Sequence, residues 1–258
     1  MDLQLKNRKA IVTGGSAGIG LAIVETLLAE GVSVVVPGRS QAKLDQALPG
    51  ERANLQKVVA DLATAEGAAA LIAAVPDADI LINNLGIYEV RPFAEITDEE
   101  WLKIFEVNVL SGVRLSRHYF PRMLAKNWGR VIFISSESGV MTPAEMVHYG
   151  VTKSSQLAVS RGMAELTKGT GVTVNAVMPG PTRSEGIVDF LKNIATPGAS
   201  AAEAESEFFE KHRSSSLLQR LIEGSEVASL VAYLASPLSA ATNGAALRVE
   251  GGLLRSIA

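Results

Sequence analysis

Short apolar runs rich in β-branched residues alternate along this chain with longer segments whose apolar residues recur at helical spacing. The runs that we expect to be strands cover residues 9–12, 32–36, 55–60, 79–82, 130–134, 172–177 and 246–249. The segments expected to be helices run from a glycine-rich turn to about residue 30, and over 40–47, 64–74, 97–126, 149–168 and 225–235. This alternation predicts an α/β fold of the Rossmann-like, doubly wound kind, with a seven-stranded, mainly parallel sheet and helices on both faces.

The pattern continues from end to end, so residues 1–258 are expected to form one domain, a size that single α/β domains reach. It changes only after Pro179-Gly180-Pro181, where mixed helical signals extend over about residues 182–218. We interpret that stretch as a segment that covers the substrate and can move.

Composition narrows the possible chemistry. The 24 Lys and Arg residues nearly balance the 27 Asp and Glu residues, so a nucleic-acid-binding surface is not indicated. The chain has no cysteine and only three scattered histidines, which argues against thiol chemistry, disulfides and a metal site. The polar N-terminus and the lack of a long apolar run favour a cytoplasmic protein that does not enter a membrane.

A glycine-rich turn, residues 13–20, lies between the first expected strand and the first helix, where such turns bind the pyrophosphate of a dinucleotide. Gly14 would permit a tight turn, Gly18 would leave room for the phosphates, and Gly20 would let helix and strand pack closely. The alternative is a turn in which glycine serves the backbone alone.

The second expected strand carries no acidic residue at its end, where an acid would bind the two ribose hydroxyls of NAD. Instead the sequence has Arg39 and Ser40, which suit a 2′-phosphate. We therefore favour NADP(H) over NAD(H), against the alternative that Arg39 is a solvated turn residue.

Tyr149 and Lys153 are four residues apart, so they share one face of the expected helix. That spacing also arises by chance, but the pair follows the strand that ends at Ser135-Ser136, and such strand ends converge on the cofactor crevice. A neighbouring ammonium stabilises a phenolate, so we expect Lys153 to lower the pKa of Tyr149 and make it a usable acid or base.

Taken together, these residues resemble the short-chain dehydrogenase/reductase family over essentially the whole chain. The family's motifs match Thr13 to Gly20, Asn83-Asn84-Leu85-Gly86, Asn108, Ser136, Tyr149, Lys153 and Pro179-Gly180. The resemblance implies that Tyr149 is the general acid/base, Ser136 polarises a carbonyl, Lys153 binds the nicotinamide ribose, and Asn108 holds a water for a proton relay.

The resemblance and the glycine turn together give a set of residues expected to bind the cofactor. They are Gly14, Ser16, Gly18, Ile19, Gly20, Arg39, Ser40, Asp61, Leu62, Asn84, Leu85, Gly86, Tyr149, Lys153, Pro179, Gly180, Thr182 and Ser184. Leu85, Ser184 and Glu250 stand where the family more often has Ala, Thr and Asp, and none of these changes removes a catalytic group.

The resulting hypothesis is an oxidoreductase that transfers hydride between nicotinamide and a small-molecule carbonyl or secondary alcohol. The family also implies a homo-oligomer, a dimer or tetramer formed through the two long helices. Two alternatives stay open: a 3-oxoacyl-thioester (acyl-carrier-protein) reductase, and a non-catalytic protein that senses NADP. Three neighbours of the site, Glu137, Ser138 and His148, are expected to serve the loop or contact solvent.

Overall fold

The computed structural model describes residues 1–257, except for the side chain of Asn193, and is built on one seven-stranded sheet. The strands are β1 (Lys9–Val12), β2 (Ser33–Gly38), β3 (Leu55–Val59), β4 (Ile80–Asn83), β5 (Gly129–Ile134), β6 (Val172–Pro179) and β7 (Ala246–Val249). Their order is β3-β2-β1-β4-β5-β6-β7, and every neighbouring pair is parallel. The predicted doubly wound fold is therefore confirmed, with a sheet that is wholly parallel.

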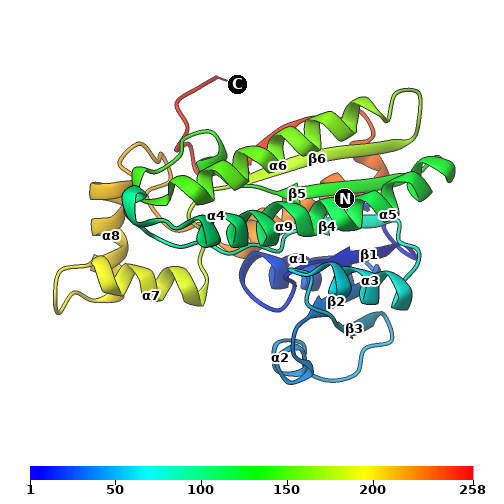
Figure 1. Cartoon of the computed structure of the whole chain (residues 1–258), viewed down its shortest axis with the longest axis horizontal. Coiled ribbons are helices and arrows are strands. Elements are labelled where there is room, and N and C mark those ends of the chain that lie inside the picture. Colours follow the sequence, from blue (N-terminus) through cyan, green and yellow to red (C-terminus); the bar gives the residue numbers. More distant parts are fainter. Residues whose placement is uncertain (258) are drawn as a thin grey trace.

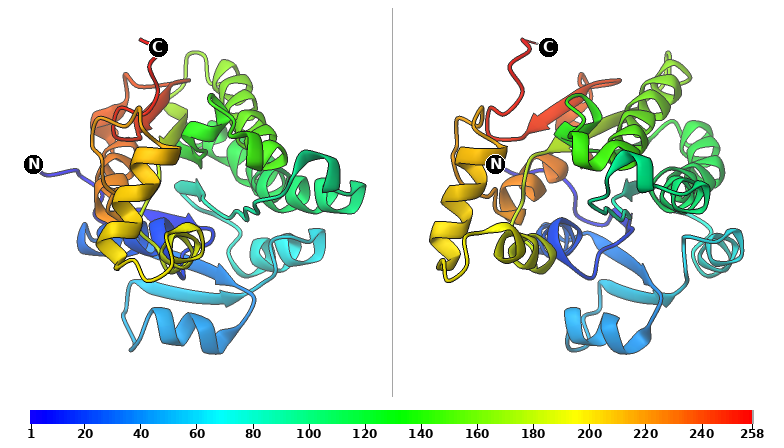
Figure 2. Two further views of the ribbon diagram at one scale, coloured as in Figure 1. Left: turned by 90° about the vertical axis from the view of Figure 1, so that its left-hand side faces the viewer. Right: turned by 60° about the vertical axis from the view of Figure 1, so that its left-hand side comes forward.

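Helices cover both faces of the sheet (Figures 1 and 2). They are α1 (Gly18–Ala29), α2 (Gln41–Ala47), α3 (Ala65–Ala74), α4 (Asp98–Phe105), α5 (Ser111–Ala125), α6 (Val147–Glu165), α7 (Glu185–Ile194), α8 (Ala201–His212) and α9 (Gly224–Ala235). Apolar side chains of α1, α2 and α9 pack in one core layer, and those of α3, α5 and α6 pack in the other.

The central strands bury side chains on both faces, which explains why they appear as continuous apolar runs rather than as alternating ones. In β1, Val12 packs in the layer with Leu27 of α1, whereas Ile11 packs in the layer with Tyr119 of α5. All four side chains are completely or almost completely buried. Backbone polar groups of these strands are satisfied by the ladders, so the polar side chains that function needs are concentrated at the strand ends.

The helix expected over residues 97–126 is interrupted. A π-helical turn, Glu106–Leu110, separates α4 from α5, so that one residue more than usual fits into that turn. Sequence periodicity did not indicate this break, because apolar residues line more than one face of the segment. The turn contains Asn108, whose position it sets.

The segment between β6 and α9 folds into α7 and α8, which lie beyond the end of the sheet, at the left of Figure 1. The two helices have a small apolar core of their own, made by Leu191, Phe208 and Phe209 together with Leu221. Arg183 bonds Glu205 and Glu223 and thereby ties the start of the segment to its end. The covering role predicted for residues 182–218 stays a prediction.

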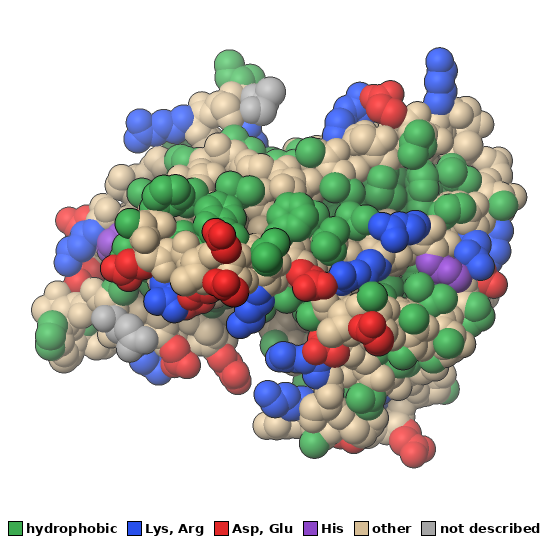
Figure 3. All heavy atoms as spheres, viewed as in Figure 1, with side chains coloured by type: hydrophobic (Ala, Val, Ile, Leu, Met, Phe, Trp, Pro, Cys, Tyr) green, Lys and Arg blue, Asp and Glu red, His purple; other side chains and the backbone are tan. Residues whose placement is uncertain are grey.

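The surface is hollowed between the part of the molecule that carries α7 and the part that carries α2 (Figure 3). The glycine turn that leads into α1 lies near this region, since a Cβ added at Gly18 would meet Ser184 at 3.5 Å. Within residues 1–257, no helix is long and apolar enough to cross a bilayer.

Gly20 fixes the close approach of α1 to the turn before it. A Cβ at this position would lie 2.2 Å from the carbonyl oxygen of Gly14 and 2.5 Å from Nδ2 of Asn84, neither of which can move freely. We predict that Gly20→Ala lowers the free energy of unfolding by about 2 kcal/mol, measured by urea titration. Gly162→Ala is the control, because no atom lies within 4 Å of a Cβ there. It lies inside α6, so it should stabilise the protein by ~0.5–1 kcal/mol. Equal effects of the two substitutions would contradict the packing argument.

Candidate active site

The turn after β1 is held to the end of β4 by a set of hydrogen bonds centred on Thr13. The Thr13 hydroxyl accepts hydrogen bonds from the backbone N–H groups of Asn84 and Leu85, both at 2.9 Å. Asn84 Nδ2 in turn donates to the carbonyl oxygens of Thr13 and Gly14, at 3.0 and 3.2 Å. The Asn84 side chain therefore acts on the turn itself, and the segment at residues 84–86 is fixed beside it.

The first turn of α1 has properties that suit an anion. The residue before the helix, Ala17, offers no side-chain hydrogen bond, and the first turn has no acidic residue, so the free N–H groups at this end keep their positive character. Gly14 and Gly18 have positive φ angles of 64° and 50°, which favour glycine. This uncapped, side-chain-free cradle fits the pyrophosphate of a dinucleotide. Ser16 and Ile19, also expected to bind the cofactor, are only partly buried here.

The ends of β2 and β3 carry the residues expected around the adenosine. Arg39 is exposed and forms none of the ion pairs found within residues 1–257. Ser40 caps α2, accepting a hydrogen bond from the Lys43 N–H at 3.5 Å. After β3, Asp61 is partly buried and accepts from the Ala63 N–H at 3.1 Å, while Leu62 is buried. A free guanidinium at this edge fits a nucleotide phosphate.

Ser136 is brought to Tyr149 and Lys153 because the end of β5 packs against α6. Ser135 Oγ donates to the Lys153 carbonyl oxygen at 2.8 Å, which joins the strand end to the helix. Lys153 Nζ donates to the carbonyl oxygen of Ile134, the last residue of β5, at 3.0 Å. The Ser136 hydroxyl lies close enough to the Tyr149 phenol to lower its pKa, against the larger effect of burial. The structure thus assembles three of the four predicted catalytic side chains.

The fourth, Asn108, is held by its neighbours through both its side chain and its backbone. Its side-chain amide exchanges hydrogen bonds with the backbone of Ile87, at 2.8 and 2.9 Å, and also donates to Thr152 at 3.0 Å. The backbone carbonyl oxygen of Asn108 accepts from Gln156 Nε2 at 2.6 Å, and Gln156 Oε1 accepts from Lys153 Nζ at 3.2 Å. A glutamine amide therefore links Asn108 to Lys153, and the water expected at Asn108 stays a prediction.

Sequence reasoning missed Gln156, although a signal was present. Gln156 lies three residues after Lys153 and seven after Tyr149, so it faces the same side of α6. The side chain is almost completely buried. Buried amides need partners for both ends, and this one finds them in the two groups that it joins.

The effect of Lys153 on Tyr149 differs from the expectation. Burial raises the pKa of the Tyr149 phenol well above its ordinary value, and the Glu137 carboxylate raises it further. The Lys153 ammonium gives its hydrogen bonds to Ile134 and Gln156 and lies 5.5 Å from the centre of the Tyr149 ring. Burial lowers the pKa of Lys153 to about 8, although the nearby Glu137 charge has the opposite, smaller effect and raises it. No lowering of the Tyr149 pKa by Lys153 is found in this arrangement, in which burial raises that pKa, and the expected effect of Lys153 stays a prediction.

Glu137 also departs from the expectation that it serves the loop or contacts solvent. It begins a short 3-10 turn (Glu137–Gly139) directly after Ser136, and only 5% of its surface is exposed. One carboxylate oxygen is hydrogen-bonded to the Ser136 hydroxyl. Burial raises the pKa of this carboxyl. A buried, titratable group therefore contacts the predicted catalytic serine.

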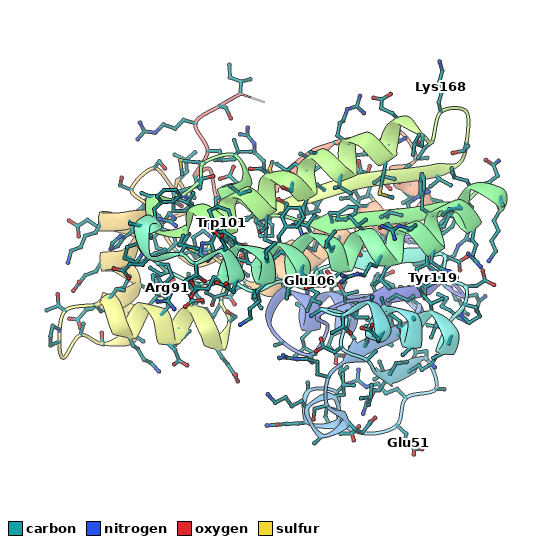
Figure 4. The ribbon with its side chains drawn as sticks, viewed as in Figure 1. Glu51, Arg91, Trp101, Glu106, Tyr119 and Lys168 are labelled. Atoms are coloured by element: carbon teal, nitrogen blue, oxygen red, sulfur yellow. The ribbon has the colours of Figure 1, made fainter. Side chains whose placement is uncertain are left out.

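The other two neighbours behave differently. His148 is buried with its ring edge-to-face against Trp101 of α4, at 5.9 Å between ring centres, so it serves packing. In the view of Figure 4, Trp101 and Tyr119 lie toward opposite ends of the molecule. Ser138 is buried, and its backbone N–H donates to Ser136 Oγ at 3.1 Å.

The remaining predicted cofactor residues line the same edge of the sheet. A Cβ at Gly86 would lie 3.5 Å from both Asn108 Oδ1 and Lys153 Nζ, so this backbone runs directly past two of the predicted catalytic groups. Gly180 follows Pro179 and approaches the backbone of Glu250, where a Cβ would meet it at 2.9 Å.

Two hydroxyls and a partly buried leucine complete that set. Thr182 Oγ1 donates to the Gly180 carbonyl oxygen at 2.9 Å, and Ser184 caps α7. Leu85 packs against the core layer of α3 and α5. Their contacts with a cofactor stay predictions.

Comparison with known proteins places the chain among well-defined relatives. A family model described as short chain dehydrogenase matches residues 8–193. An uncharacterised oxidoreductase of Bacillus subtilis, YvaG, is 47% identical over 264 residues, with full coverage of both chains. A 3-oxoacyl-[acyl-carrier-protein] reductase of Vibrio cholerae is 31% identical, covering 97% of this chain and 99% of its own.

Among solved structures, L-sorbose reductase from Gluconobacter frateurii, complexed with NADPH and L-sorbose, superposes with a TM-score of 0.92. Its sequence is 29% identical, and the match covers all of both chains. The family match, the full-length relatives and the assembled Ser136, Tyr149 and Lys153 agree, and the chain belongs to the short-chain dehydrogenase family of oxidoreductases.

Proposed function

We propose that this protein transfers hydride between NADP(H) and a carbonyl or secondary alcohol, with Tyr149 as the general acid and base. The observation that carries the proposal is that Ser136, Tyr149 and Lys153 lie together at the end of β5. The backbone of Gly86 runs past them, since a Cβ added at Gly86 would lie 3.5 Å from Lys153 Nζ. A nicotinamide cofactor, when bound, supplies the hydride. Everything else in the reaction is positioning and proton transfer by the chain.

The glycine turn and the first turn of α1 would hold the pyrophosphate, and Arg39 with Ser40 would hold a 2′-phosphate. Lys153 Nζ has three N–H donors, and Ile134 and Gln156 use two, which leaves one for a ribose hydroxyl. Tyr149, kept protonated by burial, donates its proton to the oxygen of the carbonyl as that oxygen gains charge. Ser136 holds the same oxygen by a hydrogen bond.

The relatives support a small carbonyl substrate without fixing it. The L-sorbose reductase is complexed with L-sorbose, and the Vibrio cholerae relative is a 3-oxoacyl-[acyl-carrier-protein] reductase. We therefore propose a screen of keto sugars, simple ketones and acyl thioesters with NADPH and with NADH. A folded protein that binds NADPH and turns over none of these classes would favour a cofactor-sensing role.

The Tyr149 hydroxyl is the proposed proton donor, so Tyr149→Phe should lower NADPH-dependent reduction by at least about 100-fold. NADPH binding, followed by fluorescence titration, should be retained, because the phenol is not needed to hold the pyrophosphate. Tyr119→Phe is the matched control: it removes a buried hydroxyl that bonds the Val75 carbonyl oxygen at 2.6 Å, far from the site (Figure 4). Near-full activity of Tyr149→Phe would rule out the assigned role.

Arg39 is the proposed contact for the 2′-phosphate. A hydrogen bond between charged groups contributes strongly to the free energy of binding, so Arg39→Ala should weaken NADPH binding about tenfold or more. NADH has no 2′-phosphate, so its binding should be unchanged. Lys168→Ala removes an exposed positive charge at the distant end of the molecule and should change neither affinity (Figure 4). The dissociation constants are measured by calorimetric titration, and equal losses for the two cofactors would contradict the preference for NADP(H).

A further inference from the structure

Within residues 1–257, Glu137 is the one carboxyl group found in direct contact with the predicted catalytic serine, and the proposed hydride transfer gives it no part. Its side chain is enclosed by groups from three elements. Ser136 lies before it at the end of β5, Tyr149 and Lys153 face it from α6, and Arg213 faces it from the residue that follows α8. Because this buried carboxyl lies beside the groups that are proposed to react, its protonation state determines which hydrogen bonds those groups can make.

The hydrogen bonds of Ser136 restrict what that state can be. A serine hydroxyl has one proton and two lone pairs. Ser136 Oγ accepts from the Ser138 N–H at 3.1 Å and is hydrogen-bonded to Glu137 Oε2, and the Tyr149 phenol lies nearby. With an ionised Glu137, which can only accept, the single proton of Ser136 must point to the carboxylate. The Ser136 hydroxyl is then not free to donate to a substrate, and its oxygen keeps a lone pair that can accept from the nearby Tyr149 phenol.

A protonated Glu137 reverses these bonds. The carboxylic acid donates to Ser136 Oγ, and the Ser138 N–H fills the second lone pair. The Ser136 hydroxyl is then free to donate its hydrogen bond elsewhere, and the nearby Tyr149 phenol no longer finds an acceptor on Ser136. Both hydroxyls can then point at one external oxygen, which is what reduction of a carbonyl requires.

We propose that Glu137 works in reduction as a protonated carboxylic acid that positions Ser136 and Tyr149 to donate to the carbonyl oxygen. The inference rests on the proposed hydride transfer. Glu137 is a positioning residue, because it acts through Ser136 and does not itself reach the substrate oxygen.

The electrostatic surroundings agree with this role. Burial is the largest influence on the pKa of Glu137 and raises it, while Ser136, Arg213 and nearby backbone N–H groups lower it by less. Arg213 does not form a tight pair with Glu137, since its Nε lies 4.0 Å from Oε1 and its Nη1 lies 3.9 Å from Glu145. Its Nη1 also donates to the His212 carbonyl oxygen at 2.8 Å. The Arg213 guanidinium therefore lowers the pKa of Glu137 by less than burial raises it.

The consequence is a pH dependence of definite sign. Below the raised pKa of Glu137, the carboxylic acid is present and the Ser136 hydroxyl is free to donate to the substrate. Above that pKa, the Ser136 hydroxyl again donates its hydrogen bond to the carboxylate. Reduction by the native protein should therefore fall with rising pH, approaching a tenfold loss per pH unit beyond that pKa.

Glu137→Gln tests the proposal, because glutamine can donate to Ser136 but has no proton to lose. Its orientation is set by Arg213, whose cationic face attracts the amide oxygen and so directs the amide N–H groups toward Ser136. We expect this variant to reduce the active carbonyl at low pH within ~3-fold of the native rate, and to lose the decline that begins below about pH 8. A decline above about pH 8 is expected in both proteins, because Lys153, whose pKa is lowered to about 8, loses its proton there. Glu145→Gln is the control, since Glu145 also lies near Arg213 but is 44% exposed and does not bond Ser136, so its profile should match the native one.

Two results would overturn the inference. One is a Glu137→Gln profile that declines with pH as the native one does. The other is a loss of about 100-fold or more at every pH in a variant that still melts and binds NADPH like the native protein.

A second measurement does not depend on turnover. Carboxyl-carbon NMR of protein labelled in its glutamates should show one resonance with a raised pKa that is missing in Glu137→Gln. A Glu137 resonance that is already ionised at low pH would overturn the inference while leaving the hydride transfer intact. Failure of the native protein to reduce any carbonyl, with that resonance present, would instead count against the proposed function and, with it, the role in reduction.

Discussion

The parallel direction of all seven strands is the constraint on which the rest of the molecule depends. Parallel strands need a crossover helix after each of them, which covers both faces with helices and leaves the strand interiors without water. Polar side chains can then be accommodated mainly at the strand ends. Because the carboxyl ends of β1, β2, β4, β5 and β6 all lie at one edge, the glycine turn, Arg39, Asn84, Ser136 and Gly180 come together there although they are far apart in the chain.

Two sets of hydrogen bonds order the polar groups at this edge. In one, Thr13 and Asn84 fix the glycine turn to the end of β4; in the other, Asn108, Gln156 and Lys153 are joined to the end of β5. Buried polar groups are costly unless they are paired, so each of them stabilises one arrangement of its neighbours. The π turn at Glu106–Leu110 contributes to this order by setting the place of Asn108.

The sequence pattern predicted the fold well because strand and helix periodicities differ and glycine marks the turns between them. Each of the seven strands was placed within about two residues, since continuous apolar runs are typical of buried parallel strands. The π turn was not predictable in this way, because one extra residue in a helix of mixed polarity leaves no periodic signal.

The site was predictable where a residue acts through its type and spacing, as with Tyr149, Lys153 and Ser136. It was less predictable where the outcome depends on burial. Glu137 and Gln156 are ordinary polar residues in the sequence, and only packing shows that Glu137 is enclosed beside Ser136 and that Gln156 joins Asn108 to Lys153. The pKa of Tyr149 illustrates the same point, because the spacing to Lys153 suggested a lowered value while burial and Glu137 raise it.

The most direct measurement follows the hydride itself. The purified protein is incubated with NADPH that carries deuterium at the transferred position of nicotinamide C4, together with the carbonyl compound that the screen identifies. Direct hydride transfer at this site requires the deuterium to appear on the former carbonyl carbon of the alcohol product, with the hydroxyl proton coming from solvent. Deuterium that appears in solvent, or a product that carries none at that carbon, would contradict the proposed reaction.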